Sequence, residues 1–357
     1  MEKIKSFYKN KTVLVTGATG FKGAWLTSWL LYLGAKVIGA GHNPNKNKNL
    51  FYQLNLHKKI KLNLFDIRDF NKLKKIIYKS KPSIIFHLAA QPLIYLSYKK
   101  PFTTFDVNFR GSLNLLEITR NSKFIKSLVI VTSDKCYESN NSPKGFKETD
   151  LLGGIDPYSA SKASTEIMTR AYRESFFKDK KIIGISTCRA GNVIGGGDWS
   201  DKRLIPDCIK SFIKKKTIVL RNPNFNRPWQ LVLEPLKGYL ILGKKQYENP
   251  KNFSGAWNFG TNPNTLKDVK TIVQYIINFW GSGKFVVLKK SKFYEQTNLQ
   301  LNISKAKKYL KWKPTYNIKN GVKMTIDWYL KVFKLKEKPE KVTYQQIKKY
   351  MHDSKIN

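Results

Sequence analysis

Short apolar runs alternate with helical patterns over the first half of the chain. Runs rich in β-branched residues predict strands at residues 11–16, 36–40, 60–64, 83–87, 126–131 and 181–190. Helical patterns lie between them, at residues 24–33, 70–80, 101–121 and 157–177. This alternation predicts an α/β fold, in which a doubly wound parallel sheet is covered by helices on both faces.

The length of 357 residues allows one large domain and a smaller lobe. We expect the sheet domain at residues 1–190, returning in part around 225–260, and an interleaved C-terminal substrate-binding lobe mainly at 191–336. In that lobe, Thr265 and Asp268 form a capping-box pattern that predicts a helix to Trp280. The polar tail at 337–357 is predicted to be either a short surface helix or disordered.

A glycine-rich turn separates the first predicted strand from the first helix. Gly17, Gly20 and Gly23 allow a tight turn and the close approach of a pyrophosphate, and the following helix supplies amide donors at its N-terminus. Because the glycines stand between a buried-type strand and a helix, the stretch with Thr19 and Phe21 predicts a dinucleotide-binding site rather than a plain structural turn. The fold is therefore expected to be Rossmann-type.

The second strand ends without the acid that often holds the ribose hydroxyls of NAD. Gly41, His42 and Asn43 stand there, and Lys46 and Lys48 are candidates for binding the 2′-phosphate of NADP. The sequence leaves the two cofactors open at this point. Because the loop contains no arginine, we expect NAD.

Further cofactor contacts are expected where the third and fourth strands end. Asp66 lies where a strand end could meet an adenine, with Ile67 beside it, and small residues after the fourth strand let a flat cofactor lie against the backbone. Asn108 is either a satisfied core amide or part of a proton relay. The residues after the fourth strand are Leu88, Ala89 and Ala90 for the cofactor and Gln91 for the substrate.

A tyrosine and a lysine four residues apart are the first candidate catalytic residues. Tyr158 and Lys162 share one helix face, and a nearby ammonium favours the phenolate of a tyrosine whose pKa is ordinarily about 10. Alone, such a pair is more often a surface pair. Polar residues that follow the fifth strand, from Thr132 to Tyr137, lie at the carboxyl edge where open sheets place their ligands.

Charge and cysteine content change this picture little. Lys and Arg number 66 against 24 acidic residues, giving a net charge of +42. The excess is spread thinly as lysine, so we expect a solvated surface rather than a nucleic-acid module; heparin binding that survives physiological salt would favour a polyanion-binding protein. Three scattered cysteines, a charged N-terminus and no long apolar run favour a cytoplasmic protein without a disulfide framework, zinc site or membrane span.

Four strings make a family resemblance specific. They are HLAAQPL from His87, TSDKCY from Thr132, RAGNVIGGGDW from Arg189 and RPWQLVLEP from Arg227. Together with the glycine turn and the Tyr158/Lys162 pair, the chain resembles the extended short-chain dehydrogenases/reductases. Within that group it is similar to the nucleotide-sugar 4,6-dehydratases, above all to the branch that acts on CDP-glucose. The likeness runs from about residue 11 to 336.

The resemblance implies an internal redox cycle with bound NAD that leaves a 4-keto-6-deoxy sugar, a precursor for deoxysugars and surface polysaccharides. Tyr158 would take the proton of the C4 hydroxyl, Lys162 would stabilise the phenolate and Ser133 would hydrogen-bond the same hydroxyl. Loss of water then needs an acid and a base. Asp134 matches the family's acid, but Lys135 stands where many relatives have a glutamate base. We expect Lys135 to be the base, although it could instead only stabilise the enolate, with the base elsewhere.

The resemblance also implies a diphosphate-binding second half. The expected substrate residues are Asn192, Arg203, Leu204, Arg221 and Arg227, each of which could instead be a surface ion partner.

A nucleotide-sugar 4-epimerase is the nearest alternative activity. It would use Tyr158 and Lys162 in the same way but would not need Asp134 and Lys135.

The resemblance also implies an oligomer. In this family the helices at 101–121 and 157–177 would suit a four-helix interface, so a homodimer or a dimer of dimers is expected.

Overall fold

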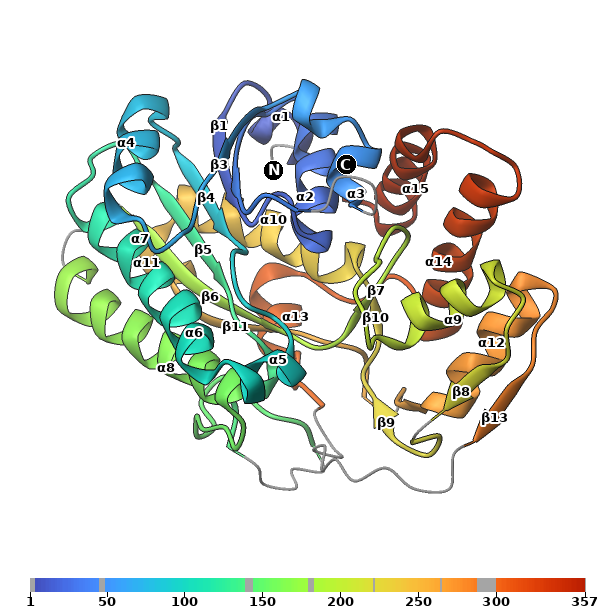
Figure 1. The fold of residues 1–357 in the computed structure, drawn as a ribbon. Coiled ribbons are helices and arrows are strands. Elements are labelled where there is room, and N and C mark those ends of the chain that lie inside the picture. Colours follow the sequence, from blue (N-terminus) through green and yellow to red (C-terminus); the bar gives the residue numbers. More distant parts are fainter. Residues whose placement is uncertain are drawn as a thin grey trace.

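The computed structural model describes residues 4–44, 49–138, 144–178, 183–220, 222–263, 265–287 and 300–356. Within these residues a seven-stranded sheet forms the centre, in the order β11–β6–β5–β4–β1–β2–β3, with every neighbouring pair parallel (Figure 1). The Rossmann-type doubly wound parallel sheet predicted from the sequence is confirmed. Its strands are β1 (Thr12–Thr16), β2 (Lys36–Gly41), β3 (Lys61–Leu64), β4 (Ile84–His87), β5 (Ser127–Val131), β6 (Gly184–Ala190) and β11 (Gly255–Phe259).

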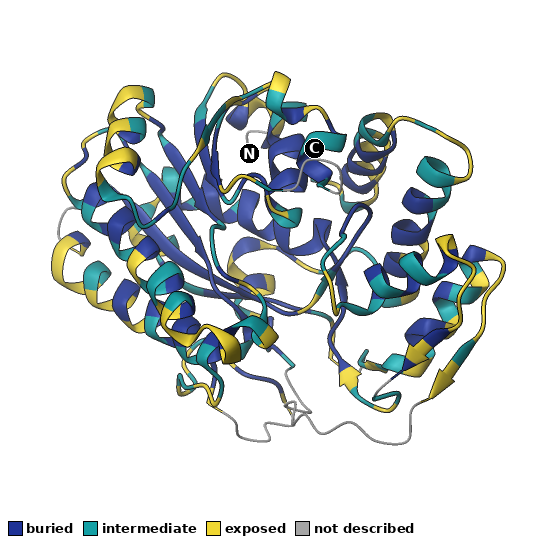
Figure 2. Cartoon of the chain, viewed as in Figure 1, coloured by how far each residue is buried: buried dark blue, intermediate teal, exposed yellow. Residues whose placement is uncertain are grey.

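The strands form where they do because both faces of the sheet are covered. Every residue of β4, β5 and β6 is buried, which suits their nearly continuous apolar runs. Along β1, Val13 and Val15 face one core cluster and Leu14 faces the other. Figure 2 shows the central strands in dark blue and the exposed residues on the outer surfaces.

Helices pack on both faces of the sheet. Residues of α4, α7 and α8 join Leu14 in one core cluster, and residues of α2 and α10 join Val13 and Val15 in the other. The helices are α1 (Ile4–Tyr8), α2 (Phe21–Tyr32), α3 (Leu50–Gln53), α4 (Phe70–Ser80), α5 (Ile94–Lys99), α6 (Pro101–Phe105), α7 (Gly111–Arg120), α8 (Pro157–Tyr172), α9 (Leu204–Ile213), α10 (Leu233–Glu248), α11 (Pro250–Phe253), α12 (Val269–Trp280), α13 (Ser304–Leu310), α14 (Ile318–Phe333) and α15 (Pro339–Ser354). No helix in the described part of the chain is both long and apolar enough to cross a bilayer.

Short strand pairs and helices α9, α12 and α14 build the second lobe, at the right of Figure 1. Its core is aromatic: the ring of Phe212 stacks on Trp280 at 5.1 Å, and Trp199 meets the edge of Tyr329 at 5.4 Å. The pairs are β7 (Val193–Ile194) with β10 (Gln230–Leu231), β9 (Asn226–Arg227) with β12 (Lys267–Asp268), and β8 (Ile218–Leu220) with β13 (Phe285–Val287).

Two helical details differ from the sequence prediction. A π-helical turn, η3 (Asp106–Arg110), interrupts the helix expected at 101–121 and separates α6 from α7. Helix α12 is capped by Asp268, whose Oδ1 accepts a hydrogen bond from the Thr271 amide at 2.6 Å, so the predicted cap at Thr265 is wrong. Both threonine and aspartate are good N-caps, and the residue that directly precedes the first helical turn takes the role.

The polar tail forms α15, which is more than a surface helix. Val342, Ile347 and Tyr350 are buried, and the ring of Tyr350 meets Trp29 of α2 edge-on at 5.7 Å. The Tyr350 hydroxyl donates to Glu234 at 2.5 Å, and Glu234 also accepts from the amides of residues 315 and 316. The tail therefore packs against the helix that follows the glycine-rich turn.

Candidate active site

The glycine-rich turn lies at the carboxyl end of β1 and presses against the end of β4. Gly17 has φ +69°, and a Cβ there would lie 2.7 Å from the Ala89 nitrogen. A Cβ on Gly23 would lie 2.0 Å from the Gly17 carbonyl oxygen. Gly20 caps α2 without a side-chain hydrogen bond. The turn thus offers bare backbone and helix amides of the kind that bind a pyrophosphate, so these residues fit a dinucleotide.

Thr19 closes this turn against the loop after β2. Its Oγ1 donates to the His42 carbonyl at 3.0 Å, and the side-chain Nδ2 of Asn49 donates to the Thr19 carbonyl at 2.9 Å. A Cβ on Gly41 would meet Thr19 Oγ1 at 2.5 Å, so glycine ends β2 for a steric reason. Phe21, half-buried, begins α2 beside this turn. Lys46 and Lys48, the candidates for a 2′-phosphate, lie outside the described residues.

Asp66 is held by an arginine that sequence reasoning did not single out. Arg68 donates to Asp66 from Nε at 2.9 Å and from a terminal nitrogen at 2.6 Å, and it also reaches Asp106 at 2.8 Å. Hydrogen bonds from Arg68 hold the pKa of the Asp66 carboxyl well below its usual value. Ile67 is buried, and its carbonyl accepts from Asn114 at 3.1 Å. The loop after β3 is therefore fixed by contacts within the protein.

Asn108 joins the segment after β4 to the helix that carries Tyr158. Its Oδ1 accepts from the Gln91 amide at 2.7 Å, and its Nδ2 donates to the Ser161 hydroxyl at 2.9 Å. The Gln91 side chain donates to Thr104 at 2.9 Å and accepts from the Leu93 amide at 2.6 Å. Both polar side chains are buried and bonded within the protein. Leu88, Ala89 and Ala90 are each half-buried at this edge of the sheet.

Tyr158 and Lys162 lie on α8, and the polar residues after β5 lie next to them. The Ser133 side chain acts to lower the pKa of Tyr158, and its hydroxyl donates to Asp134 Oδ1 at 3.1 Å. Lys162 donates from Nζ to the Val131 carbonyl at 3.2 Å. Asp156 starts α8 by accepting from the Ser159 amide at 3.0 Å, with proline in the first turn. The structure therefore brings the residues of the predicted catalytic set into one place.

Burial governs the electrostatics of this cluster. It raises the pKa of Tyr158 to about 12 and lowers the pKa of Lys162 to about 8. Burial also raises the pKa of Asp134, against the opposing charges of Lys135 and Arg227. A buried carboxyl with a raised pKa is suited to donate a proton.

Two of the predicted substrate residues, Arg203 and Arg227, act on this cluster through their charges. Arg203 stands directly before α9 and donates to Asp198 at 3.1 Å, and its charge acts on Tyr158. Arg227 is buried, and its charge acts on Asp134. Asn192 is exposed after β6, and Leu204 is half-buried as the first residue of α9. Arg221 lies outside the described residues.

The family model described as GDP-mannose 4,6 dehydratase matches residues 14–325. The chain belongs to this family. CDP-glucose 4,6-dehydratase of Salmonella typhimurium is 40% identical over 330 residues, which cover 91% of this chain and 92% of that relative. UDP-glucuronate 4-epimerase of Thermodesulfobacterium geofontis is 27% identical over 88% of this chain and 95% of its own. The resemblance stated from the sequence motifs is thus confirmed.

Solved structures of related enzymes share this fold. The dTDP-glucose 4,6-dehydratase of Bacillus anthracis in complex with NAD has a TM-score of 0.75 at 23% identity and covers 91% of this chain and 98% of its own. UDP-glucose 4-epimerase of Thermotoga maritima with UDP-glucose has a TM-score of 0.77 at 21% identity, covering 90% and 99%. Dehydratases and epimerases thus share one scaffold, so the side chains at the site must separate the two reactions.

Lys22, in the first turn of α2, is a residue of the candidate site that sequence reasoning missed. Burial lowers its pKa to about 8, with Arg203 acting in the same direction and Asp134 opposing. Its charge also lowers the pKa of Lys162. The sequence signal was a lysine between two glycines of a cofactor turn, a position that places its side chain at the carboxyl edge of the sheet.

Proposed function

We propose that the protein removes water from CDP-glucose and releases CDP-4-keto-6-deoxyglucose, using a bound NAD that is restored in each turnover. The observation that carries this proposal is the meeting of Ser133 and Asp134 with Tyr158, in a member of a 4,6-dehydratase family. The 40% identity to a CDP-glucose 4,6-dehydratase supports cytidine as the base.

The cofactor-binding proposal rests on the shape and donors of the glycine-rich turn. Gly17, Gly20 and Gly23 with the first amides of α2 would hold the pyrophosphate. The Asp66–Ile67 loop would receive the adenine, the segment of residues 88–90 the nicotinamide half, and Lys162 the ribose beside it. When bound, NAD supplies a hydride acceptor for C4 of the sugar and a donor for C6 after water has left.

Tyr158 acts at the sugar C4 hydroxyl in the first step. Its phenolate takes the proton of that hydroxyl, while the Ser133 hydroxyl holds the sugar oxygen in place. Asn108 ties the helix that bears Tyr158 to the segment after β4, so it keeps the phenol aligned with the cofactor site. The product of this step is a C4 ketone, which acidifies the proton on C5.

Asp134 and Lys135 carry out the elimination. Lys135, acting as the uncharged amine, takes the C5 proton, Asp134 gives a proton to the C6 hydroxyl, and water leaves as the C5–C6 double bond forms. The raised pKa of buried Asp134 suits a proton donor. Reduction at C6 and protonation at C5 then complete the 4-keto-6-deoxy sugar.

The second lobe would hold the nucleotide diphosphate. Arg203 and Arg227 bring two guanidinium groups to the edge of the cluster, where they can pair with phosphate oxygens. Asn192 and Leu204 would line the same side, and Arg221 completes the predicted set. These contacts would hold the sugar between the lobe and Tyr158.

The test is incubation with CDP-, dTDP-, UDP- and GDP-glucose, followed by mass spectrometry for a product lighter by one water. We expect this product from CDP-glucose, without added cofactor if NAD stays bound. Preferential turnover of dTDP-glucose would overturn the choice of substrate. Inversion at C4 without loss of water would identify a 4-epimerase instead, and binding of polyanions without turnover of any sugar would favour a binding protein.

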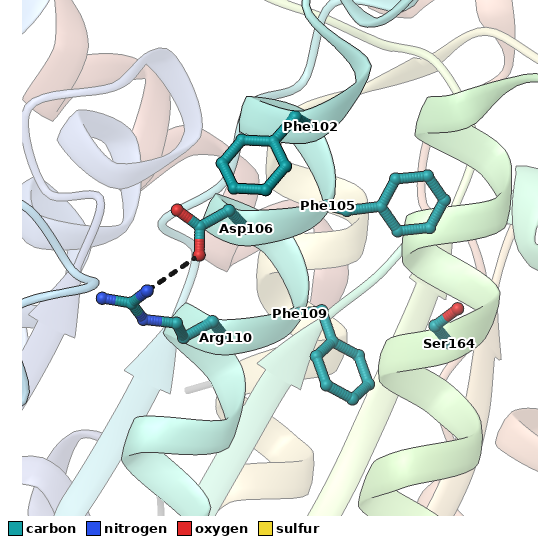
Figure 3. Close-up of a pocket in the computed structure, with 6 residues that line it drawn as sticks. All are labelled: Phe102, Phe105, Asp106, Phe109, Arg110 and Ser164. Atoms are coloured by element: carbon teal, nitrogen blue, oxygen red, sulfur yellow. Dashed lines mark ion pairs between the residues drawn. The ribbon is translucent and has the colours of Figure 1, made fainter.

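We further propose a homodimer formed through α6–α7 and α8. The aromatic residues Phe102, Phe105 and Phe109 of α6 and η3 line a pocket together with Ser164 of α8, and the rings of Phe105 and Phe109 lie on the side of α8 (Figure 3). Phe102 is 81% exposed, and Ile167 on α8 is 55% exposed. Side chains of this kind on a monomer commonly mark a surface that another chain covers.

The product class also suggests a place in metabolism. A 4-keto-6-deoxy sugar nucleotide must be consumed by enzymes that reduce, deoxygenate or aminate it, as in deoxysugar synthesis for O-antigen and other surface polysaccharides. We place the reaction in the cytoplasm, in line with the prediction from the sequence.

A further inference from the structure

A buried ion pair lies directly beneath the candidate site. Glu166 is on α8, one helical turn after Lys162 and two after Tyr158, so the three side chains share a helix face. Arg189 is in β6 and donates to Glu166 Oε2 at 2.9 Å. Their side chains are only 2% and 3% exposed. No step of the proposed reaction uses either residue.

Glu166 holds the start of the polar segment that follows β5. Its Oε1 accepts from the Thr132 hydroxyl at 2.5 Å, and its Oε2 accepts from the Thr187 hydroxyl at 2.6 Å as well as from Arg189. Burial would raise the pKa of Glu166, but Arg189 and the two hydroxyl donors keep it below the usual value. The carboxylate is therefore charged and fully bonded.

Arg189 holds the end of the same segment. One of its terminal nitrogens donates to the Tyr137 hydroxyl at 2.7 Å, and the guanidinium lies over the Tyr137 ring at 4.7 Å. Tyr137 in turn donates to Asn258 of β11 at 2.8 Å and stacks on Phe146 at 4.8 Å. The Tyr137 ring is thus fixed from several sides.

Thr132 and Tyr137 bracket residues 133–136, the strand-end segment. From these contacts we propose that the Glu166–Arg189 pair is a positioning device: one ion pair anchors both ends of the strand-end segment to the helix that carries Tyr158 and Lys162. This inference rests on the proposed function, which assigns the elimination to Asp134 and Lys135. Neither Glu166 nor Arg189 touches substrate in it.

Inside the strand-end segment two hydrogen bonds to Ser133 lie at or beyond the long end of the usual range, while from outside it the Gly153 amide donates to the Cys136 carbonyl at 2.9 Å. The Cys136 amide reaches the Ser133 carbonyl at 3.4 Å, and the Lys135 amide reaches Ser133 Oγ at 3.2 Å. The same sugar must lose its C4 hydroxyl proton to a group on α8 and its C5 proton to a group on the segment. A displacement of about 1 Å between reacting groups can cost roughly a hundredfold in rate.

The test uses two mild variants, since removing either charge would leave a buried unpaired ion. Thr132→Val removes the donor to Glu166, and Tyr137→Phe removes the acceptor for Arg189. The matched control for Thr132→Val is Thr169→Val on α8, where the Thr169 hydroxyl donates to the Thr165 carbonyl at 2.7 Å. The matched control for Tyr137→Phe is Tyr8→Phe, because the Tyr8 hydroxyl donates to the Leu240 carbonyl at 2.8 Å. All four residues are buried.

We expect each test variant to lower kcat for dehydration by about tenfold or more while KM changes by less than about twofold, because positioning and not binding is lost. The control variants should lower the melting temperature about as much as the test variants do, while their kcat stays nearly unchanged. In the double variant the losses in kcat should be less than additive, because both act through one ion pair. Amide hydrogen exchange of residues 133–136 should also rise in the test variants and not in the controls.

Equal kcat in test and control variants, or additive losses with unchanged exchange in the segment, would overturn the positioning role. The wild-type assay separates this from failure of the proposed function. If the wild type does not dehydrate any sugar nucleotide, the proposed function fails, and the exchange measurement still decides whether the pair anchors the segment.

Discussion

At the candidate site, burial favours the neutral form of three side chains, those of Tyr158, Lys162 and Lys22. Burial raises the pKa of Tyr158 to about 12 and lowers those of Lys162 and Lys22 to about 8. A phenol in this state keeps its proton at neutral pH. Arg203 already lowers the pKa of Tyr158, and the positive nicotinamide ring of bound NAD would act in the same direction.

Lys135 gives the first prediction at this scale. Lys135→Ala should still reduce the bound cofactor on adding CDP-glucose but should lose dehydration by about 10²–10⁴-fold, because the C5 proton has no acceptor. Mass spectrometry of product and of deuterium uptake at C5 measures both. Wild-type rates of elimination and C5 exchange in this variant would show that the base lies elsewhere. Lys75→Ala, an exposed lysine on α4, is the control.

Lys22 gives a prediction about pH and stability. Its pKa is about 8 in the folded chain and about 10.5 when unfolded, so between these values the unfolded chain binds more protons. The stability cost of burying the charge is full below pH 8 and disappears as the pH rises to about 10.5. Lys22→Met should therefore raise the free energy of unfolding at pH 7 by roughly 2 kcal/mol, from an upper bound of about 1.4 kcal/mol per pKa unit.

Urea unfolding across this pH range measures the Lys22 effect. The difference between Lys22→Met and wild type should shrink from pH 8 to pH 10.5, while Lys75→Met should show no such trend. A difference that stays constant with pH would mean that Lys22 remains charged in the folded chain or is already solvated.

At the scale of elements, the turn between β1 and α2 leaves no room for side chains at its glycines. A Cβ on Gly23 would overlap the Gly17 carbonyl at 2.0 Å, and α2 cannot retreat because α15 packs behind it. Gly23→Ala should cost about 1–3 kcal/mol of stability and release NAD. NAD retained after gel filtration and unfolding by urea measure the two effects.

Gly321→Ala on α14 is the matched control for Gly23→Ala. A Cβ there would make ordinary contacts, the nearest at 3.5 Å from Leu231 Cβ. The variant should keep both stability and NAD. Retention of NAD by Gly23→Ala at the wild-type level would contradict the assignment of this turn to the pyrophosphate.

At the scale of the whole molecule, the exposed phenylalanines of α6 predict self-association. A double variant Phe102→Glu/Phe105→Glu should convert a dimer to a monomer, because two buried carboxylates would lie in an apolar interface. Light scattering at several protein concentrations measures the mass. Tyr309→Glu, an exposed aromatic on α13, is the control. A wild-type protein that is monomeric throughout would contradict the proposed dimer.

Much of this molecule follows from local patterns in the sequence. The strands are continuous apolar runs because both sheet faces are covered, and the ligand edge follows from the parallel order, so the sequence alone assigns Gly17, Ser133 and Tyr158 to one edge. Helix boundaries also follow from local signals, as at α4 (Phe70–Ser80), where Asp69 caps the first turn.

The tertiary structure alone decided which polar groups are engaged within the protein and which charges meet. Local pattern could not reveal that Arg68 holds Asp66, that Lys22 reaches the surroundings of Asp134, or that the polar tail buries Tyr350 against Trp29. Hydrogen bonds and charge interactions depend on distances between residues far apart in sequence, and only the packed fold sets those distances. The sequence determined the chemical groups and the sheet edge where they gather, and the fold determined their partners and protonation.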